Sequence, residues 1–109
     1  MSTDLGYRDF IADLLSDLGG VSFRPMMGEY VVYLYGKVVG GIYDCRFLVK
    51  ATAGALSLLK EEGKEPHFEI PYEGAKQMLA VDVDDRGLAC RLVQAVANDL
   101  PEPKPKKRG

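Results

Sequence analysis

Residues 30–43 read YVVYLYGKVVGGIY, and this stretch decides the fold. Two runs rich in β-branched and aromatic residues flank Gly36-Lys37, and a two-residue connection between such runs is typical of an antiparallel hairpin. Runs of the same kind, at residues 21–23 and 47–49, precede and follow this segment after short breaks. The sequence therefore predicts a meander of about four antiparallel strands.

The run at residues 30–35 is apolar on both of its faces. Alternation directs three residues to one face (Tyr30, Val32, Leu34) and three to the other (Val31, Tyr33, Tyr35). We expect helices to cover the first face. The second face carries tyrosines, whose rings bury area while their hydroxyls stay hydrated, and this suits a subunit interface. The alternative is that a long helix or the C-terminal segment covers it.

An amphipathic helix is expected before the strands. Apolar residues recur at spacings of three and four between Leu5 and Leu18, with aspartates on the opposite face. Ser2 or Thr3 is the expected N-cap, and Gly19-Gly20 the expected stop.

Two more helices and one more strand are expected after residue 50. Thr52 can cap a short helix that ends near Gly63, and residues 64–71 follow as a loop with a short extended piece. Residues 79–83 alternate as a strand, with Phe68 and Ile70 expected to point inward in the loop before it. Asp84 or Asp85 then caps a last helix in which Leu88, Leu92, Val96 and Leu100 repeat every fourth residue.

The order of these elements predicts the fold class. It lacks the regular alternation of strand and helix that a parallel sheet requires. We expect an α+β fold with two layers, in which an antiparallel sheet of about four to five strands packs against N- and C-terminal helices. Residues 1–100 form one domain in this interpretation, and residues 101–109 form a disordered, basic, proline-rich tail.

Charge is unevenly distributed along the chain. Residues 1–100 hold ten basic and fifteen acidic groups, whereas residues 101–109 hold four basic groups and one acidic group. An acidic body repels phosphate, so weak nucleic-acid contact would use the four basic tail residues Lys104, Lys106, Lys107 and Arg108. The alternative is a solubilising terminus. The longest uncharged stretch, 51–59, is too short to cross a bilayer, and no secretory signal is recognisable, so we expect a cytoplasmic protein.

No motif for catalysis, metal binding or a cofactor stands out. Cys45 and Cys90 lack metal-ligand spacing, and we expect them to be free thiols in apolar sites. His67 is the single histidine and is expected in an exposed loop. The rival hypothesis is a small hydrolase or ligand-binding enzyme that uses four residues converging in a cleft: Arg24, Glu29, Lys50 and His67. We expect no enzyme and no cofactor.

Residues 24–30, RPMMGEY, form one remaining cluster. Thioether side chains repack against varied partners, so two methionines beside an arginine favour an adaptable docking surface. The alternative is core methionine with a surface ion pair. The candidate interaction surface comprises Arg24, Met26, Met27, Glu29, Tyr33 and Tyr35, and it is expected to serve an unidentified protein partner or a second copy in a homodimer.

This cluster, the hairpin after it and residues 71–76 resemble the TfoX N-terminal domain family, which is named after bacterial regulators of natural competence. The elements that carry the resemblance are Phe23, Arg24, Met26, Met27, Gly28, Tyr33, Gly36, Ile42 and residues 48–50. It covers roughly residues 5–100. Met27 stands where an aromatic residue is common, and Glu29 where a second glycine is common.

The resemblance implies a two-layer α+β domain without known catalytic residues or cofactor. It also implies a link to transcriptional regulation through partner proteins. Full competence regulators carry a second, helical domain, and the resemblance is to the N-terminal one. The resulting expectation is a non-enzymatic regulatory or adaptor domain that acts through protein–protein interaction.

Overall fold

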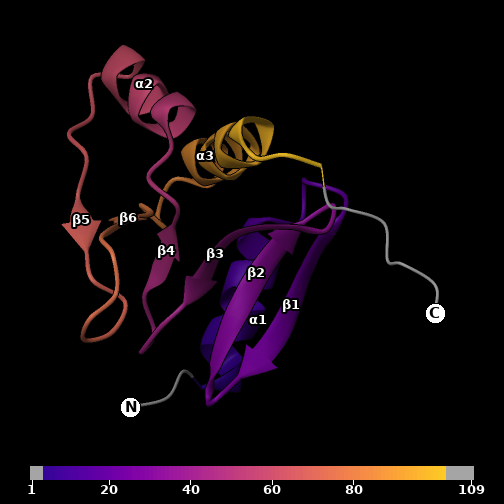
Figure 1. Cartoon of the computed structure of the whole chain (residues 1–109). Helices are drawn as coiled ribbons and strands as arrows, with labels where there is room; N and C mark the ends of the chain where they lie inside the picture. Colours follow the sequence, from indigo (N-terminus) through magenta and orange to yellow (C-terminus); the bar gives the residue numbers. More distant parts are fainter. Residues whose placement is uncertain (1–3, 103–109) are drawn as a thin grey trace, which may run out of the picture.

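A computed structural model describes residues 4–102, in which three helices and six strands form two layers (Figure 1). The helices are α1 (Leu5–Leu14), α2 (Ala53–Glu61) and α3 (Arg86–Asp99). The strands are β1 (Val21–Met26), β2 (Glu29–Leu34), β3 (Lys37–Ile42), β4 (Phe47–Val49), β5 (Phe68–Glu69) and β6 (Met78–Ala80). All neighbours are antiparallel, in the order β1-β2-β3-β4-β6-β5, which confirms the predicted fold class.

Tight turns of two residues build the meander from β1 to β4. Both turn residues have positive φ in each case, as type I′ turns require: Met27 and Gly28, Tyr35 and Gly36, Asp44 and Cys45. This hand of turn matches the right-handed twist of the strands it joins. Successive strands of this meander run in opposite directions, so every second turn lies at the same end of the sheet. The turns Met27-Gly28 and Asp44-Cys45 therefore lie at one end, and the turn Tyr35-Gly36 lies at the other.

One face of the sheet is packed against helices and holds the core. In Figure 1, α1 lies behind β1, β2 and β3, and α3 contacts β2, β3 and α1. The strand residues in this core are fully or almost fully buried and mostly aliphatic: Val32, Leu34, Val39, Ile42, Phe47, Val49 and Leu79. Burial of such side chains contributes about 1.5–3 kcal/mol each, which makes this layer the main source of stability.

The N-caps of α2 and α3 agree with the sequence prediction, whereas both ends of α1 differ from it. Thr52 and Asp85 cap α2 and α3 as predicted, each accepting a backbone N–H three residues on. The N-cap of α1 is Asp4, which accepts the Tyr7 N–H, so the expectation of Ser2 or Thr3 is wrong. Helix α1 also ends at Leu14, well before the glycine pair.

Contacts from α3 accompany the early end of α1. Arg86, at the start of α3, donates to the carbonyl oxygens of Asp13 and Leu14 and pairs with the Asp13 carboxylate. These carbonyls are among those that a helix C-terminus leaves without intrahelical partners. Residues 15–20 then form turns rather than further helix.

Strand β5 is the sixth strand, beyond the four to five expected. It has two residues and pairs with β6 through Phe68 opposite Leu79 and Glu69 opposite Met78. Two residues are too few to show an alternating pattern in the sequence. The expectation that Phe68 and Ile70 point inward is wrong, since both are exposed at this edge of the sheet.

None of the helices formed by residues 4–102 has the length and apolar character needed to cross a lipid bilayer.

Candidate functional site

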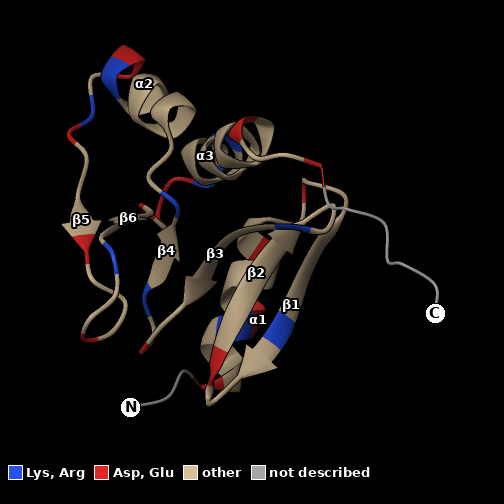
Figure 2. Ribbon diagram, viewed as in Figure 1, with Lys and Arg blue, Asp and Glu red and all other residues tan. Residues whose placement is uncertain are grey.

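The second face of the sheet is the candidate site. The register aligns Arg24, Val31, Gly41 and Leu48 across β1, β2, β3 and β4, on the face opposite the helix-covered row that holds Val32. Within the described residues 4–102, no helix lies in front of β2 and β3 in Figure 1. Figure 2 shows charged residues on β2 and β3 only at the ends of these strands, so their central parts carry no charge.

An apolar groove opens at the end of this face where two of the hairpin turns lie. We call it the methionine groove; its volume is about 380 Å³ and its lining residues are Met26, Met27, Glu29, Tyr43, Pro71 and Tyr72. Met27 is 97% exposed and Met26 45% exposed, whereas Pro71 is buried. The groove thus combines a fixed floor with two flexible side chains at its rim.

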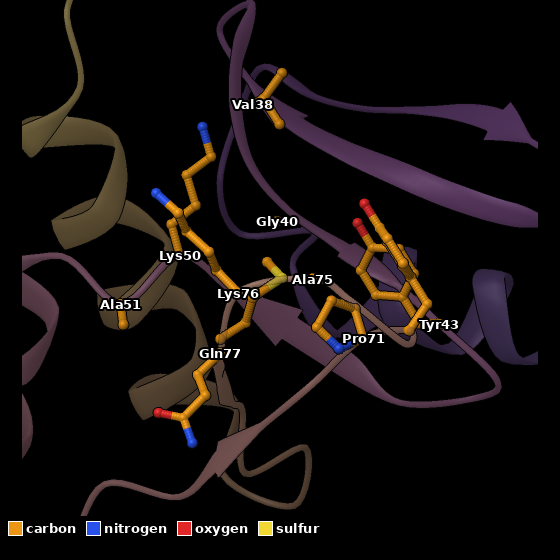
Figure 3. A pocket seen from close by; sticks show the side chains of 11 residues that line it. Val38, Gly40, Tyr43, Lys50, Ala51, Pro71, Ala75, Lys76 and Gln77 are labelled. Carbon is orange, nitrogen blue, oxygen red and sulfur yellow. The ribbon is translucent and has the colours of Figure 1, made fainter.

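A second cavity, the lysine cleft, adjoins the groove and has a volume of about 490 Å³. Its lining residues are Val38, Gly40, Tyr43, Lys50, Ala51, Pro71, Tyr72, Ala75, Lys76, Gln77 and Met78. Figure 3 shows Lys50 and Lys76 on one side of the cavity and Tyr43 and Pro71 on the other. The wall formed by Tyr43, Pro71 and Tyr72 belongs to both cavities.

Gly41 allows Tyr43 to form that wall. A Cβ atom at Gly41 would lie 2.6 Å from the Tyr43 ring, so the ring folds over the glycine onto the sheet. The Tyr43 and Tyr72 rings are tilted by 59° with centroids 6.0 Å apart, within the favourable range for aromatic pairs. Burial raises the pKa of the Tyr43 hydroxyl, and the nearby Tyr72 and Glu29 raise it further.

Arg46 fixes the other half of the wall. Its Nη1 donates to Glu69 Oε1 at 2.8 Å and to the Ile70 carbonyl at 3.3 Å, and its Nη2 donates to the Pro71 carbonyl at 3.1 Å. Its Nε donates to the Tyr43 carbonyl at 3.1 Å. One guanidinium therefore attaches the segment after β5 to the β3–β4 turn, which places Pro71 and Tyr72 beside Tyr43.

Glu29 joins two turns of the site. Its Oε1 accepts the backbone N–H of Asp44 at 3.0 Å, which links the start of β2 to the β3–β4 turn. Asp44 has a φ of 53°, so its N–H is presented by a turn of fixed geometry. The carboxylate thus helps to hold Met27-Gly28 and Asp44-Cys45 at a constant separation.

A known family model covers most of the chain. Residues 13–96 match the family model of the TfoX N-terminal domain. The chain belongs to the TfoX N-terminal domain family. A curated relative, an uncharacterized 12.7 kDa protein encoded in the trpE 5′ region of Spirochaeta aurantia, is 35% identical over 109 residues, which cover 98% of this chain and 91% of the relative. The matched span includes every strand, the methionine groove and the lysine cleft.

Only some residues of the predicted interaction surface of this TfoX N-terminal domain lie together in one place. Met26, Met27 and Glu29 line the methionine groove. Arg24 and Tyr33 lie nearer the opposite end of the uncovered face, where the guanidinium carbon stands 5.9 Å from the centroid of the tyrosine ring in a cation–π contact. This pair lines a separate hollow.

Tyr35 lies just beyond strand β2 and not within it as predicted. Strand β2 ends at Leu34, and Tyr35 occupies the next turn with a φ of 50°. Its N–H donates to the Gly20 carbonyl, and its ring lies so close to Gly20 that a Cβ atom there would collide with it. Alternation fails at this position because the chain has already turned.

The four residues of the enzyme hypothesis are not gathered in one place. Arg24 lines the hollow beside Tyr33, Glu29 the methionine groove, and Lys50 the lysine cleft. His67, which is exposed as expected, lines a fourth cavity near α2 and α3. Among residues 4–102, no group of three or more histidine, cysteine or acidic side chains is placed to hold a metal ion.

The two cysteines of this family member differ in their surroundings. Cys90 is partly buried, its Sγ donates to the Leu14 carbonyl, and burial followed by the charge of Asp17 raises the pKa of its thiol. Cys45 is exposed in the β3–β4 turn, so the expectation of an apolar site is wrong for it. It is one of the two central residues of a hairpin turn at the end of the sheet.

Most of the predicted tail at residues 101–109 lies outside the described residues. This part includes the four basic residues for which nucleic-acid contact was the hypothesis: Lys104, Lys106, Lys107 and Arg108.

Sequence reasoning missed Tyr43, Arg46, Pro71 and Tyr72 as site residues. Arg46 contacts residues 23 to 25 positions away, a separation that no local pattern reveals. The glycine two positions before Tyr43 was the one available signal, because a glycine inside a strand often marks a close approach by another group.

Proposed function

We propose that this TfoX N-terminal domain is a non-enzymatic regulatory or adaptor domain of the cytoplasm that acts through protein–protein contact, and that it forms a homodimer through the methionine groove. The family takes its name from competence regulators, which supports a regulatory role. The partly buried Cys90 thiol, hydrogen-bonded to a carbonyl, suits a reducing compartment.

The conformation and exposure of Met27 carry the proposal. Its φ of 52° is a left-handed conformation that costs a side chain about 1 kcal/mol relative to glycine, and its side chain is 97% exposed. The residue therefore lowers stability and gains no packing within the chain. Strained, solvent-exposed apolar residues of this kind are typical of contact surfaces.

The shape of this region favours a second copy as the partner. A protruding flexible methionine stands directly beside an apolar hollow on the same surface. In a twofold arrangement each Met27 enters the groove of the other copy, since a twofold interface uses the same patch twice. The unbranched thioether adapts to the aromatic wall of Tyr43 and Tyr72, which sulfur contacts favourably.

Sedimentation velocity tests the proposal, with the chain at about 1 µM to about 1 mM, the range of moderate affinities. We expect a concentration-dependent shift from monomer to dimer. Met27→Gly removes the side chain and relieves the strain, and it is expected to weaken dimerisation by about tenfold or more.

Cys45→Gly is the matched control. Cys45 also has a positive φ and is exposed at the same end of the sheet, but it does not line the groove. Its replacement should leave dimerisation unchanged. A wild-type chain that stays monomeric over the whole series, or equal dimerisation by the wild type and Met27→Gly, contradicts the proposal.

A further inference from the structure

The lysine cleft has the size and lining of a small-molecule site, and we propose that it binds an organic anion with a flat apolar body, such as an aromatic carboxylate. Its volume of about 490 Å³ lies within the range of about 300–1,000 Å³ that is typical of ligand sites. This inference goes beyond the proposed function and does not depend on dimerisation.

The charge of the cleft is the first argument. Lys50 and Lys76 lie on the same side of the cavity, and no acidic residue is among its lining residues (Figure 3). Within residues 4–102, the side chain of neither lysine takes part in an ion pair or a hydrogen bond. Two ammonium groups without a protein counter-ion thus border one cavity in an otherwise acidic body.

The chain builds this arrangement from two distant segments. Lys50 follows β4, where alternation from Leu48 places it on the uncovered face. Lys76 lies two residues before Met78, in the segment that enters β6. Pairing of β4 with β6 brings the two segments together, so the positive charges converge because of the sheet topology.

The opposite side of the cleft is apolar and aromatic. Tyr43, Pro71 and Tyr72 form one wall, and Val38 and Met78 contribute aliphatic and thioether surface. Aromatic rings stack favourably on tyrosine and pack against proline, whereas inorganic anions gain nothing from such a wall. Cationic groups on one side and an aromatic wall on the other favour a ligand with a carboxylate on a ring over a simple ion.

Binding of three probes to the full chain tests the inference, followed through the amide signals of Lys50, Ala51 and residues 75–78 in heteronuclear NMR spectra. 2-Naphthoate supplies an aromatic ring and a negative charge. 2-Naphthalenemethanol supplies the ring alone, and inorganic phosphate supplies the charge alone. We expect saturable one-to-one binding of 2-naphthoate, about tenfold weaker binding of the alcohol, and no saturable binding of phosphate.

Substitution of the lysines locates the binding. The double variant Lys50→Gln, Lys76→Gln should lower the affinity for 2-naphthoate about tenfold and leave that for the alcohol unchanged. The double variant Lys60→Gln, Lys64→Gln, which removes two exposed charges outside the cleft, is the control and should bind 2-naphthoate like the wild type.

Three outcomes overturn the inference. They are the absence of saturable 2-naphthoate binding, equal 2-naphthoate affinity in the wild type and the Lys50→Gln, Lys76→Gln variant, and phosphate binding as strong as that of 2-naphthoate. Because dimerisation is measured separately with Met27→Gly, none of these outcomes alters the test of the proposed function.

Discussion

The two faces of the sheet are made from the same strands but have different compositions. The helix-covered face uses aliphatic residues such as Val32, Leu34 and Ile42, which are at most 1% exposed. The uncovered face carries Arg24, Tyr33, methionines and a tyrosine wall, with two cavities between them.

The covered face is therefore expected to determine stability, and the uncovered face recognition. On the covered face the physical requirement is a filled volume, because a buried gap loses contacts and hydrophobic burial. On the uncovered face the requirement is the correct placement of the wall and the turns. Gly41, the Arg46 guanidinium and the Glu29 carboxylate supply it. Substitutions that separate stability from binding test this distinction.

Truncation of the covered face has the largest expected effect. Leu79→Ala removes a side chain that is 0% exposed and should lower the free energy of unfolding by about 3 kcal/mol. Met26→Ala, at a residue 45% exposed on the other face, should lower it by less than about 1 kcal/mol. Urea unfolding followed by circular dichroism measures both, and equal losses would contradict the distinction between the faces.

Adjacent glycines of β3 give the next comparison. A Cβ atom at Gly40 would collide with the backbone carbonyl of Leu48, so Gly40→Ala should cost about 2 kcal/mol. At Gly41 the obstacle is the Tyr43 ring, which can swing away, so Gly41→Ala should cost less than about 1 kcal/mol but displace the wall. The shift of the Tyr43 ring signals in NMR spectra reports this displacement, and an unmoved ring would show that Gly41 does not position it.

Loss of the Arg46 guanidinium should have a moderate effect. Arg46→Met keeps the apolar stem but removes four hydrogen bonds, and it should lower stability by about 1–2 kcal/mol. Hydrogen exchange should increase at residues 69–72. Arg91→Met, which breaks an exposed pair with Glu62, is the control and should change stability by less than about 0.5 kcal/mol. Unchanged exchange in Arg46→Met would contradict the positioning role.

Met27→Gly should increase stability by about 0.5–1 kcal/mol, because glycine adopts the left-handed conformation without strain. Thermal unfolding measures the gain, and Cys45→Gly should give a gain of similar sign. A loss of stability in Met27→Gly would mean that the methionine contributes packing within the chain, against the account given above.

The pH dependence near the wall is expected to be small and confined to alkaline conditions. Since burial raises the pKa of Tyr43, the folded chain holds this proton more tightly than the unfolded chain. The contribution of Tyr43 to the free energy of unfolding is complete below the ordinary tyrosine pKa of about 10. It declines as the pH rises toward the pKa of Tyr43 in the folded chain. Tyr43→Phe should reduce this decline in chemical denaturation, and an unchanged slope would contradict it.

The strands and caps were predictable because their signals are local. Alternation, the Gly36 turn and the capping residues Thr52 and Asp85 are visible within a few positions of each element. Tyr35 was predicted to belong to the strand but lies in the following turn, because alternation does not reveal where a strand ends.

The shared wall of the site was not predictable in this way. It depends on Arg46 reaching the carbonyl oxygens of Ile70 and Pro71, and on Tyr43 folding over a glycine. The Arg46 contacts depend on the tertiary pairing of β4 with β6, and the charge convergence at the lysine cleft has the same origin. The sequence patterns named Met26, Met27 and Glu29 but not the surface they would face.

The most direct test of the recognition role of the uncovered face is a concentration series of amide NMR spectra of the wild-type chain. We expect shifts that grow with concentration at residues 26–29, at Tyr43 and at Tyr72, with the signals of α2 and of the buried core strands unmoved. Concentration-independent spectra, or shifts centred on α2 or on the β5 edge, would contradict the account.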